Sequence, residues 1–77
     1  MESDFAEVTL HIDEETSHTE REIFRDVLLS MDGVMAAAYH DERPHLIMIE
    51  YNPAVIQSIA FVDTAKKQGF HAELIGL

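Results

Sequence analysis

The sequence predicts one small α+β domain whose elements follow the order strand, helix, strand, strand, helix, strand. Three observations lead to this prediction. Residues 6–12 alternate apolar and polar side chains, which is the period of a half-buried strand. Residues 17–31 place apolar side chains on the 3.6-residue period of an amphipathic helix. Residues 45–51 are rich in β-branched and aromatic side chains, which favour a strand. We expect residues 1–77 to form a single domain with an ordered core at about 6–75.

The first helix has a clear start signal. Ser17 followed by Glu20 forms a capping box, in which each residue's side chain accepts a hydrogen bond from the other's backbone amide. Thr16 and Thr19 compete for the cap position, and Thr19 begins a second box in a shifted register. Negative charge is favoured at this positive end of the helix dipole. Four acids gather there: Glu14, Glu15, Glu20 and Glu22.

The body of this helix divides into an apolar and a polar face. The apolar stripe consists of Ile23, Phe24, Val27, Leu28 and Met31. The residues expected to face water are Arg21, Glu22, Arg25 and Asp26. Gly33 suits a left-handed cap just beyond the helix end.

The second half of the chain repeats the strand and helix signals. We expect a hairpin of strands at 34–40 and 45–51, joined by a turn at 41–44. Asn52 and Pro53 are typical of a helix start, so the second helix is expected to run from there to about Gln68. A last strand is expected at 70–75. The residues of the second helix expected to face the core are Val55, Ile59, Phe61, Val62 and Ala65.

This βαββαβ order is typical of a ferredoxin-like sandwich, a four-stranded antiparallel sheet with two helices on one face. The expected strand order is 4-1-3-2. The loop after the first strand, the hairpin turn and the turn before Phe70 would then lie at one end of the domain.

Charge and composition restrict the function. The net charge of −10, from 15 acids against 5 lysines and arginines, argues against nucleic acid and against an anionic membrane surface. A basic partner or a cation is favoured. No cysteine is present, which excludes thiolate chemistry. No apolar run is long enough for a membrane span and no signal-peptide pattern is present, so we expect a cytoplasmic location.

Several short phrases give the sequence a resemblance to a known family. They are Leu29-Ser30-Met31-Asp32-Gly33-Val34, Tyr51-Asn52-Pro53 and Gln68-Gly69-Phe70. In their order and spacing they resemble landmarks of the heavy-metal-associated domain, found in copper chaperones and in the N-terminal modules of metal-pumping ATPases. The resemblance covers about residues 7–75 and implies the same ferredoxin-like fold.

The metal loop of that family is altered in this chain. The family's loop carries a Cys-x-x-Cys motif, and counting back from Gly33 places the two cysteine positions on Ser17 and Glu20. The family's packed methionine falls on Glu15. Monovalent copper needs thiolate ligands, so the family's soft-metal chemistry is not expected here.

Histidine and carboxylate side chains remain as candidate metal ligands. Five histidines fall at or near the expected loop end: His11, His18, His40, His45 and His71. Such ligands suit a divalent zinc, nickel, cobalt or copper ion. The sharpest pair is His11 with His71, expected as cross-strand or diagonal neighbours, with His18 as a third candidate. His40 and His45 flank the hairpin turn and are expected to face each other. The alternative is that these are ordinary surface histidines.

The open face of the sheet offers a second kind of site. Leu46 and Met48 are expected to point away from the helices, where apolar side chains mark a partner or self-association surface. Glu14 and Glu15 are the candidate partner-binding residues at the loop end. We therefore expect a non-enzymatic binding module that serves protein interaction or metal homeostasis. The alternative function is metal binding or delivery through histidine and carboxylate. No catalytic residues and no certain cofactor are predicted.

Overall fold

The computed structural model describes residues 5–75, and expectations for residues 1–4 and 76–77 lie outside this range. Six elements follow one another in the predicted order. They are β1 (Ala6–Ile12), α1 (His18–Leu29), β2 (Val34–Tyr39), β3 (Leu46–Tyr51), α2 (Ile59–Lys67) and β4 (Ala72–Ile75). The sheet order is β2-β3-β1-β4 and each neighbouring pair is antiparallel. Both the ferredoxin-like fold class and the predicted strand order are confirmed.

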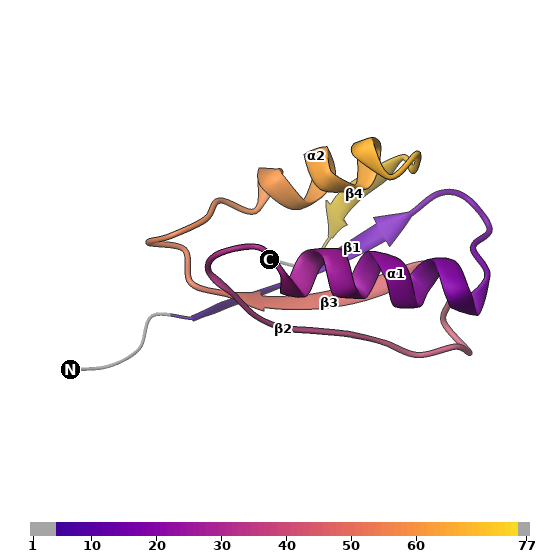
Figure 1. The fold of residues 1–77 in the computed structure, drawn as a ribbon, viewed down its shortest axis with the longest axis horizontal. Helices are drawn as coiled ribbons and strands as arrows, with labels where there is room; N and C mark the ends of the chain where they lie inside the picture. Colours follow the sequence, from indigo (N-terminus) through magenta and orange to yellow (C-terminus); the bar gives the residue numbers. More distant parts are fainter. Residues whose placement is uncertain (1–4, 76–77) are drawn as a thin grey trace.

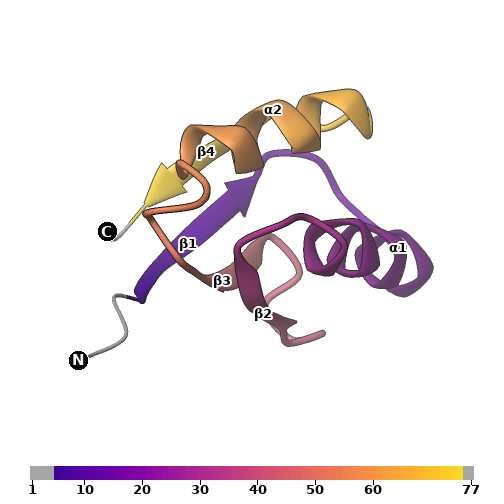
Figure 2. The same ribbon diagram turned by 60° about the vertical axis from the view of Figure 1, so that its left-hand side comes forward.

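The two helices cover one face of the sheet (Figure 1). Helix α1 contacts β2, and α2 contacts β4, so each helix lies over one half of the sheet (Figure 2). Every second side chain of β1 points into the layer between helices and sheet, as the alternation of residues 6–12 predicts. The buried core consists of Val8, Leu10, Ile12, Phe24, Leu28, Ile47, Ile49, Tyr51, Phe61 and Ala65. Among residues 5–75, neither helix lies over the opposite face of the sheet.

The predicted start of the second helix is wrong. Asn52 begins a turn: its carbonyl accepts from the amides of Val55 and Ile56, and its side chain accepts from the amide of Ala54 at 2.9 Å. Such side-chain bonds offer the backbone an alternative to a helix. Helix α2 begins at Ile59 instead. As a result, Val55 and Ile59, which were predicted to face the core, are 58% and 53% exposed.

The strands of the hairpin are shorter than predicted. His40 and His45 lie outside β2 and β3, because a turn occupies residues 40–45. In this turn the amide of Arg43 donates to the carbonyl of His40 at 2.9 Å, and the amide of Leu46 donates to that of Arg43 at 3.1 Å. Strand β2, an edge strand, carries a register shift between Val34 and Ala36. Strand β4, at the other edge, begins at Ala72 rather than at residue 70.

Two glycines have the left-handed backbone conformation: Gly69 just beyond the end of α2, and Gly33 directly before β2 rather than in the predicted cap of the first helix, whose C-cap residue is Ser30. Gly33 has φ of +94° and Gly69 has φ of +92°. A Cβ atom on Gly33 would lie 2.9 Å from side-chain atoms of Val55 and Ile56, whereas one on Gly69 would have nothing within 4 Å. Gly33 is therefore required by both its conformation and its close approach to the 52–58 turn, and Gly69 by its conformation alone.

We predict that Gly33→Ala destabilises the domain more than Gly69→Ala. Both changes force an alanine into the left-handed region, at about 1–2 kcal/mol. Gly33→Ala adds a clash that costs about 1–3 kcal/mol more. Urea unfolding of the two variants beside the wild type measures both terms. Equal losses in the two variants would show that the 52–58 turn yields to the added methyl group without cost.

Candidate functional site

Three segments meet at one end of the domain, as predicted. The amide of Ile12 donates to the carbonyl of His45, and the amide of Asp13 donates to the carbonyl of His71, both at 2.8 Å. The Thr16 hydroxyl lies 3.4 Å from the carbonyl of Pro44. These contacts join the loop at 13–17 to the turn at 40–45 and to the segment before β4. We call this region the loop end.

The predicted capping box is formed in its first register. The Ser17 hydroxyl accepts from the amide of Glu20 at 3.1 Å, and the Glu20 carboxylate accepts from the amide of Ser17 at 2.8 Å. The resemblance places the family's two cysteines at these same two positions. In this chain the two side chains satisfy backbone amides of the first turn of α1.

Arg21 was predicted to face water and is instead buried, with 6% of its surface exposed. Its guanidinium donates to the Thr16 carbonyl at 2.6 Å and to the Asp41 carboxylate at 3.0 Å. It also lies over the Tyr39 ring, 5.6 Å from the centroid. The guanidinium, with its fork of five donors, can bridge several acceptors at once. The loop, the helix start and the β2–β3 turn are thereby tied to one side chain.

Two acids adjoin Arg21. The carboxylate of Asp41 also accepts from the His18 ring at 3.0 Å, and these two hydrogen bonds, from His18 and then Arg21, lower the pKa of Asp41. The Tyr39 hydroxyl donates to the Glu22 carboxylate, which raises the pKa of Tyr39 to about 12. The tyrosine is therefore a neutral donor at physiological pH.

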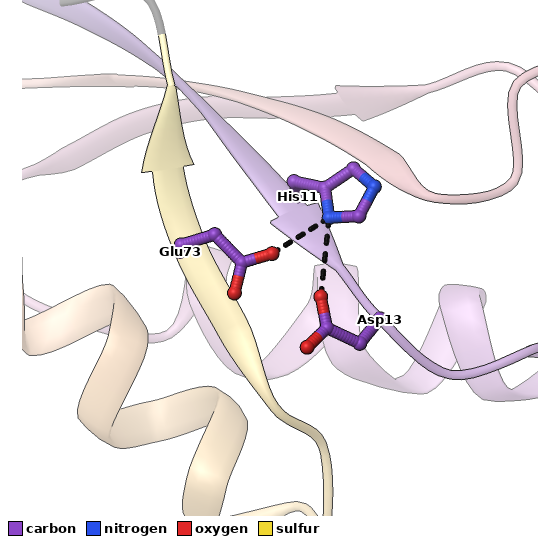
Figure 3. Close-up of side chains that lie close together, drawn as sticks. All are labelled: His11, Asp13 and Glu73. Atoms are coloured by element: carbon purple, nitrogen blue, oxygen red, sulfur yellow. Dashed lines mark hydrogen bonds and ion pairs between the residues drawn. The ribbon is translucent and has the colours of Figure 1, made fainter.

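His11 lies at the end of β1 on the open face of the sheet. The residue directly opposite it on β4 is Glu73, and His71 lies two residues before that partner, in the diagonal position of the prediction. The Nδ1 atom of His11 is 2.8 Å from the Glu73 carboxylate and 3.3 Å from that of Asp13 (Figure 3). His45 stacks on the His11 ring with centroids 5.6 Å apart, so it faces His11 rather than the predicted His40.

His71 is held by Glu14. The Nδ1 atom of His71 donates to one Glu14 carboxylate oxygen at 2.6 Å, and the backbone amide of His71 donates to the other at 2.8 Å. The hydrogen bond to Glu14, followed by its charge, raises the pKa of His71 above the ordinary value of 6.5. The same contacts lower the pKa of Glu14 below 4.5.

The three predicted metal ligands thus lie at one end but in separate contacts. His18 is beside Asp41, His71 beside Glu14, and His11 beside Asp13 and Glu73. Within residues 5–75, His11, Asp13 and Glu73 are the one group of three such side chains with ligand atoms within 4.8 Å of one another. Sequence reasoning missed Glu73, although an antiparallel pairing of β1 with β4 in this register places it opposite His11.

The open face of the sheet carries the predicted apolar side chains. Met48, on the central strand β3, is 40% exposed, and Leu46 on the same strand is half-buried. Both line a shallow groove of about 150 Å³ on this face. Its other lining residues are Thr9, Ala38, Tyr39, His40 and Arg43. None of the helices within residues 5–75 is long and apolar enough to cross a membrane.

Comparisons with known proteins place the fold. No protein-family model matches the sequence, and no curated protein matches it. Solved structures do match. The N-terminal domain of a potential copper-translocating P-type ATPase from Bacillus subtilis, in its Cu(I)-loaded state, has a TM-score of 0.84 at 19% identity, over 94% of this chain and 89% of that one.

Two further structures have the same architecture. Oxidized MerP from Ralstonia metallidurans CH34 has a TM-score of 0.83 at 12% identity, over 94% of this chain and 99% of its own. The CopZ metallochaperone has a TM-score of 0.79 at 16% identity, over 88% and 100%. The chain therefore has the ferredoxin-like fold of heavy-metal-associated domains. Within that fold it is a cysteine-free domain with a capping box at the start of α1.

We predict that Arg21→Lys destabilises the domain by about 1–3 kcal/mol, because an ammonium cannot reproduce the bonds to both Thr16 and Asp41 from a buried position. Arg25→Lys is the matched control, since Arg25 pairs with Glu22 and Asp26 at the surface, and we expect little change there. Urea unfolding measures both. A wild-type stability for Arg21→Lys would mean that the loop end does not depend on the guanidinium fork.

We predict that NMR titration finds the pKa of His71 above 6.5 and that Glu14→Gln brings it back towards that value. Because the folded pKa of His71 is raised, its pairing stabilises the fold below pH 6.5 and the contribution is lost as pH rises through the folded pKa. The pKa of Glu14 is lowered in the folded state. The stability that the ionised Glu14 contributes is therefore present above pH 4.5 and is lost as pH falls through the folded pKa of Glu14. An unchanged His71 titration in Glu14→Gln would exclude this pair.

Proposed function

We propose that this domain is a non-enzymatic binding module, related to metal homeostasis, that docks a positively charged protein surface through its acidic loop end. The observation that carries the proposal is that some acidic side chains at the loop end are paired with basic side chains and others are not. Glu14 and Asp41 are bound to histidine or arginine side chains. Glu15 and Glu42 are exposed and form no ion pair with any other residue within 5–75.

The net charge supports a basic partner. A chain at −10 repels nucleic acid and other acidic surfaces, and it accelerates the encounter with a basic protein surface. The rigid frame of the loop end also favours docking. Arg21 and the two backbone bonds to His45 and His71 hold the loop in one arrangement, so little conformational entropy is lost when a partner binds.

The link to metal homeostasis comes from the fold neighbours. They include a metallochaperone and the N-terminal domain of a potential copper-translocating P-type ATPase. The absence of cysteine removes the thiolates that such a fold would offer to a soft metal, and Ser17 and Glu20 are engaged with each other. An adaptor role, in which the docking surface is kept without the thiolates, accounts for both facts.

The open face of the sheet is the second surface to be tested. Met48 and Leu46 give it an apolar centre, and two copies of the chain could meet there. The loop end is favoured as the main docking surface because the chain's excess negative charge has no role in an interface between two identical acidic faces.

We predict that Glu15→Lys with Glu42→Lys weakens docking at least about tenfold, while Glu7→Lys with Asp32→Lys does not. The control pair makes the same change in net charge but lies at the other end of β1 and beyond the end of α1. The domain is immobilised at low salt, partners are captured from a cell extract and identified by mass spectrometry, and each is remeasured by calorimetry as a purified protein.

The proposal is supported by a purified partner whose affinity drops at least about tenfold with the loop-end pair, holds with the control pair and weakens with salt. Loss of binding in Met48→Glu alone would move the interface to the sheet face. Sedimentation at several concentrations identifies self-association. If the chain self-associates and Met48→Glu abolishes this, self-association through the sheet face would replace the proposed function.

A further inference from the structure

We infer that His11, Asp13 and Glu73 form a binding site for a divalent transition-metal ion such as Zn²⁺ on the open face of the sheet. This site lies outside the loop positions that carry cysteine in heavy-metal-associated domains, and it goes beyond the docking function proposed above. Neither inference depends on the other. The three side chains come from β1, from the residue after β1 and from the cross-strand position of β4.

The first argument is convergence on one atom. Both carboxylates approach the same ring nitrogen, Nδ1 of His11, at 2.8 and 3.3 Å, while the other ring nitrogen points away from them (Figure 3). Nδ1 can carry only one hydrogen, so it cannot give two full hydrogen bonds. A metal ion in place of that hydrogen would be shared by the nitrogen and both carboxylates.

The second argument is spacing. Ligand atoms about 2.0–2.2 Å from one Zn²⁺ ion at tetrahedral angles lie about 3.3–3.6 Å apart. The Nδ1–Asp13 distance of 3.3 Å already falls in that range, and the Nδ1–Glu73 distance of 2.8 Å needs to widen by about half an ångström. Because 53% of the Glu73 side chain is accessible, it has room to make this adjustment.

The third argument is that the imidazole is already held. Its neighbour His45 stacks at an interplanar angle of 17°. The Nδ1 atom of His45 donates to the carbonyl of Ile12 at 2.7 Å, which fixes the second ring in turn. The stacked ring of His45 limits how far the His11 ring can turn. The histidine therefore pays little ordering cost when a metal binds.

Charge and access fit a hydrated cation. Two carboxylates and a neutral imidazole supply a charge of −2 to the ion. The side chains of Asp13 and His11 are 52% and 38% exposed, so water can fill the remaining coordination positions. Lys66 and His71 line the same hollow as Asp13 and Glu73. Imidazole with carboxylate suits zinc, cobalt, nickel or divalent copper rather than monovalent copper.

The test uses the purified chain with ZnCl₂ in calorimetry and CoCl₂ in visible absorption and NMR. We expect one equivalent to bind and Co²⁺ to broaden first the resonances of His11, Asp13 and Glu73. Removing a direct ligand should cost at least the roughly ten- to hundredfold that loss of a supporting residue costs. His11→Ala and Glu73→Gln should therefore each weaken Zn²⁺ binding at least about tenfold.

His40→Ala is the matched control, since it removes a histidine from the same end of the domain and should leave the affinity within about twofold. Amide NMR spectra of each variant confirm that the fold is kept, and Glu73→Gln at the surface serves if His11→Ala fails to fold. Absence of saturable one-equivalent binding would overturn the proposal. So would wild-type affinity in both ligand variants, or first broadening at His71 or His18.

Discussion

The geometry of the loop end depends on the buried guanidinium of Arg21. Desolvating an arginine is costly unless its donors find partners, and the two terminal nitrogens of this one donate to Thr16 and Asp41, which lie in two different segments. The cost of burial therefore enforces the arrangement: if the loop or the hairpin turn moves, a charge is left buried without partners. A small domain with few core residues gains a fixed polar end in this way.

A second constraint is the self-sufficiency of the helix start. In this chain the side chains of Ser17 and Glu20 accept from backbone amides at the first turn of α1. The neighbouring acids Glu14, Asp13 and Glu15 are not needed to cap the helix. Glu14 is bound by His71, Asp13 is turned towards His11, and Glu15 remains at the surface. The acidic side chains of this one short segment therefore lie in three different environments: an ion pair within the fold, the open face of the sheet, and solvent.

The fold was predictable from sequence because its signals are local and consistent. The alternation in β1 and the capping box agree with the tertiary structure, and so does the strand order. The second helix was misplaced because Asn52 has two uses, as a helix cap and as the start of a turn, and local sequence does not distinguish them. The prediction that Arg21 faces water was wrong because hydrophobic periodicity indicates only which apolar side chains are buried. It does not indicate a buried charge whose partners lie elsewhere in the chain.

The site was predictable only in its location. Topology brings five histidines to one end, but which carboxylate each one meets depends on strand register, and a shift by one residue exchanges faces.

The edges of the sheet have a consequence of their own. Strand β2 is interrupted by its register shift and β4 is only four residues long, so neither edge offers a long, regular row of unpaired backbone groups. Pairing between the sheet edges of two copies is therefore disfavoured within residues 5–75.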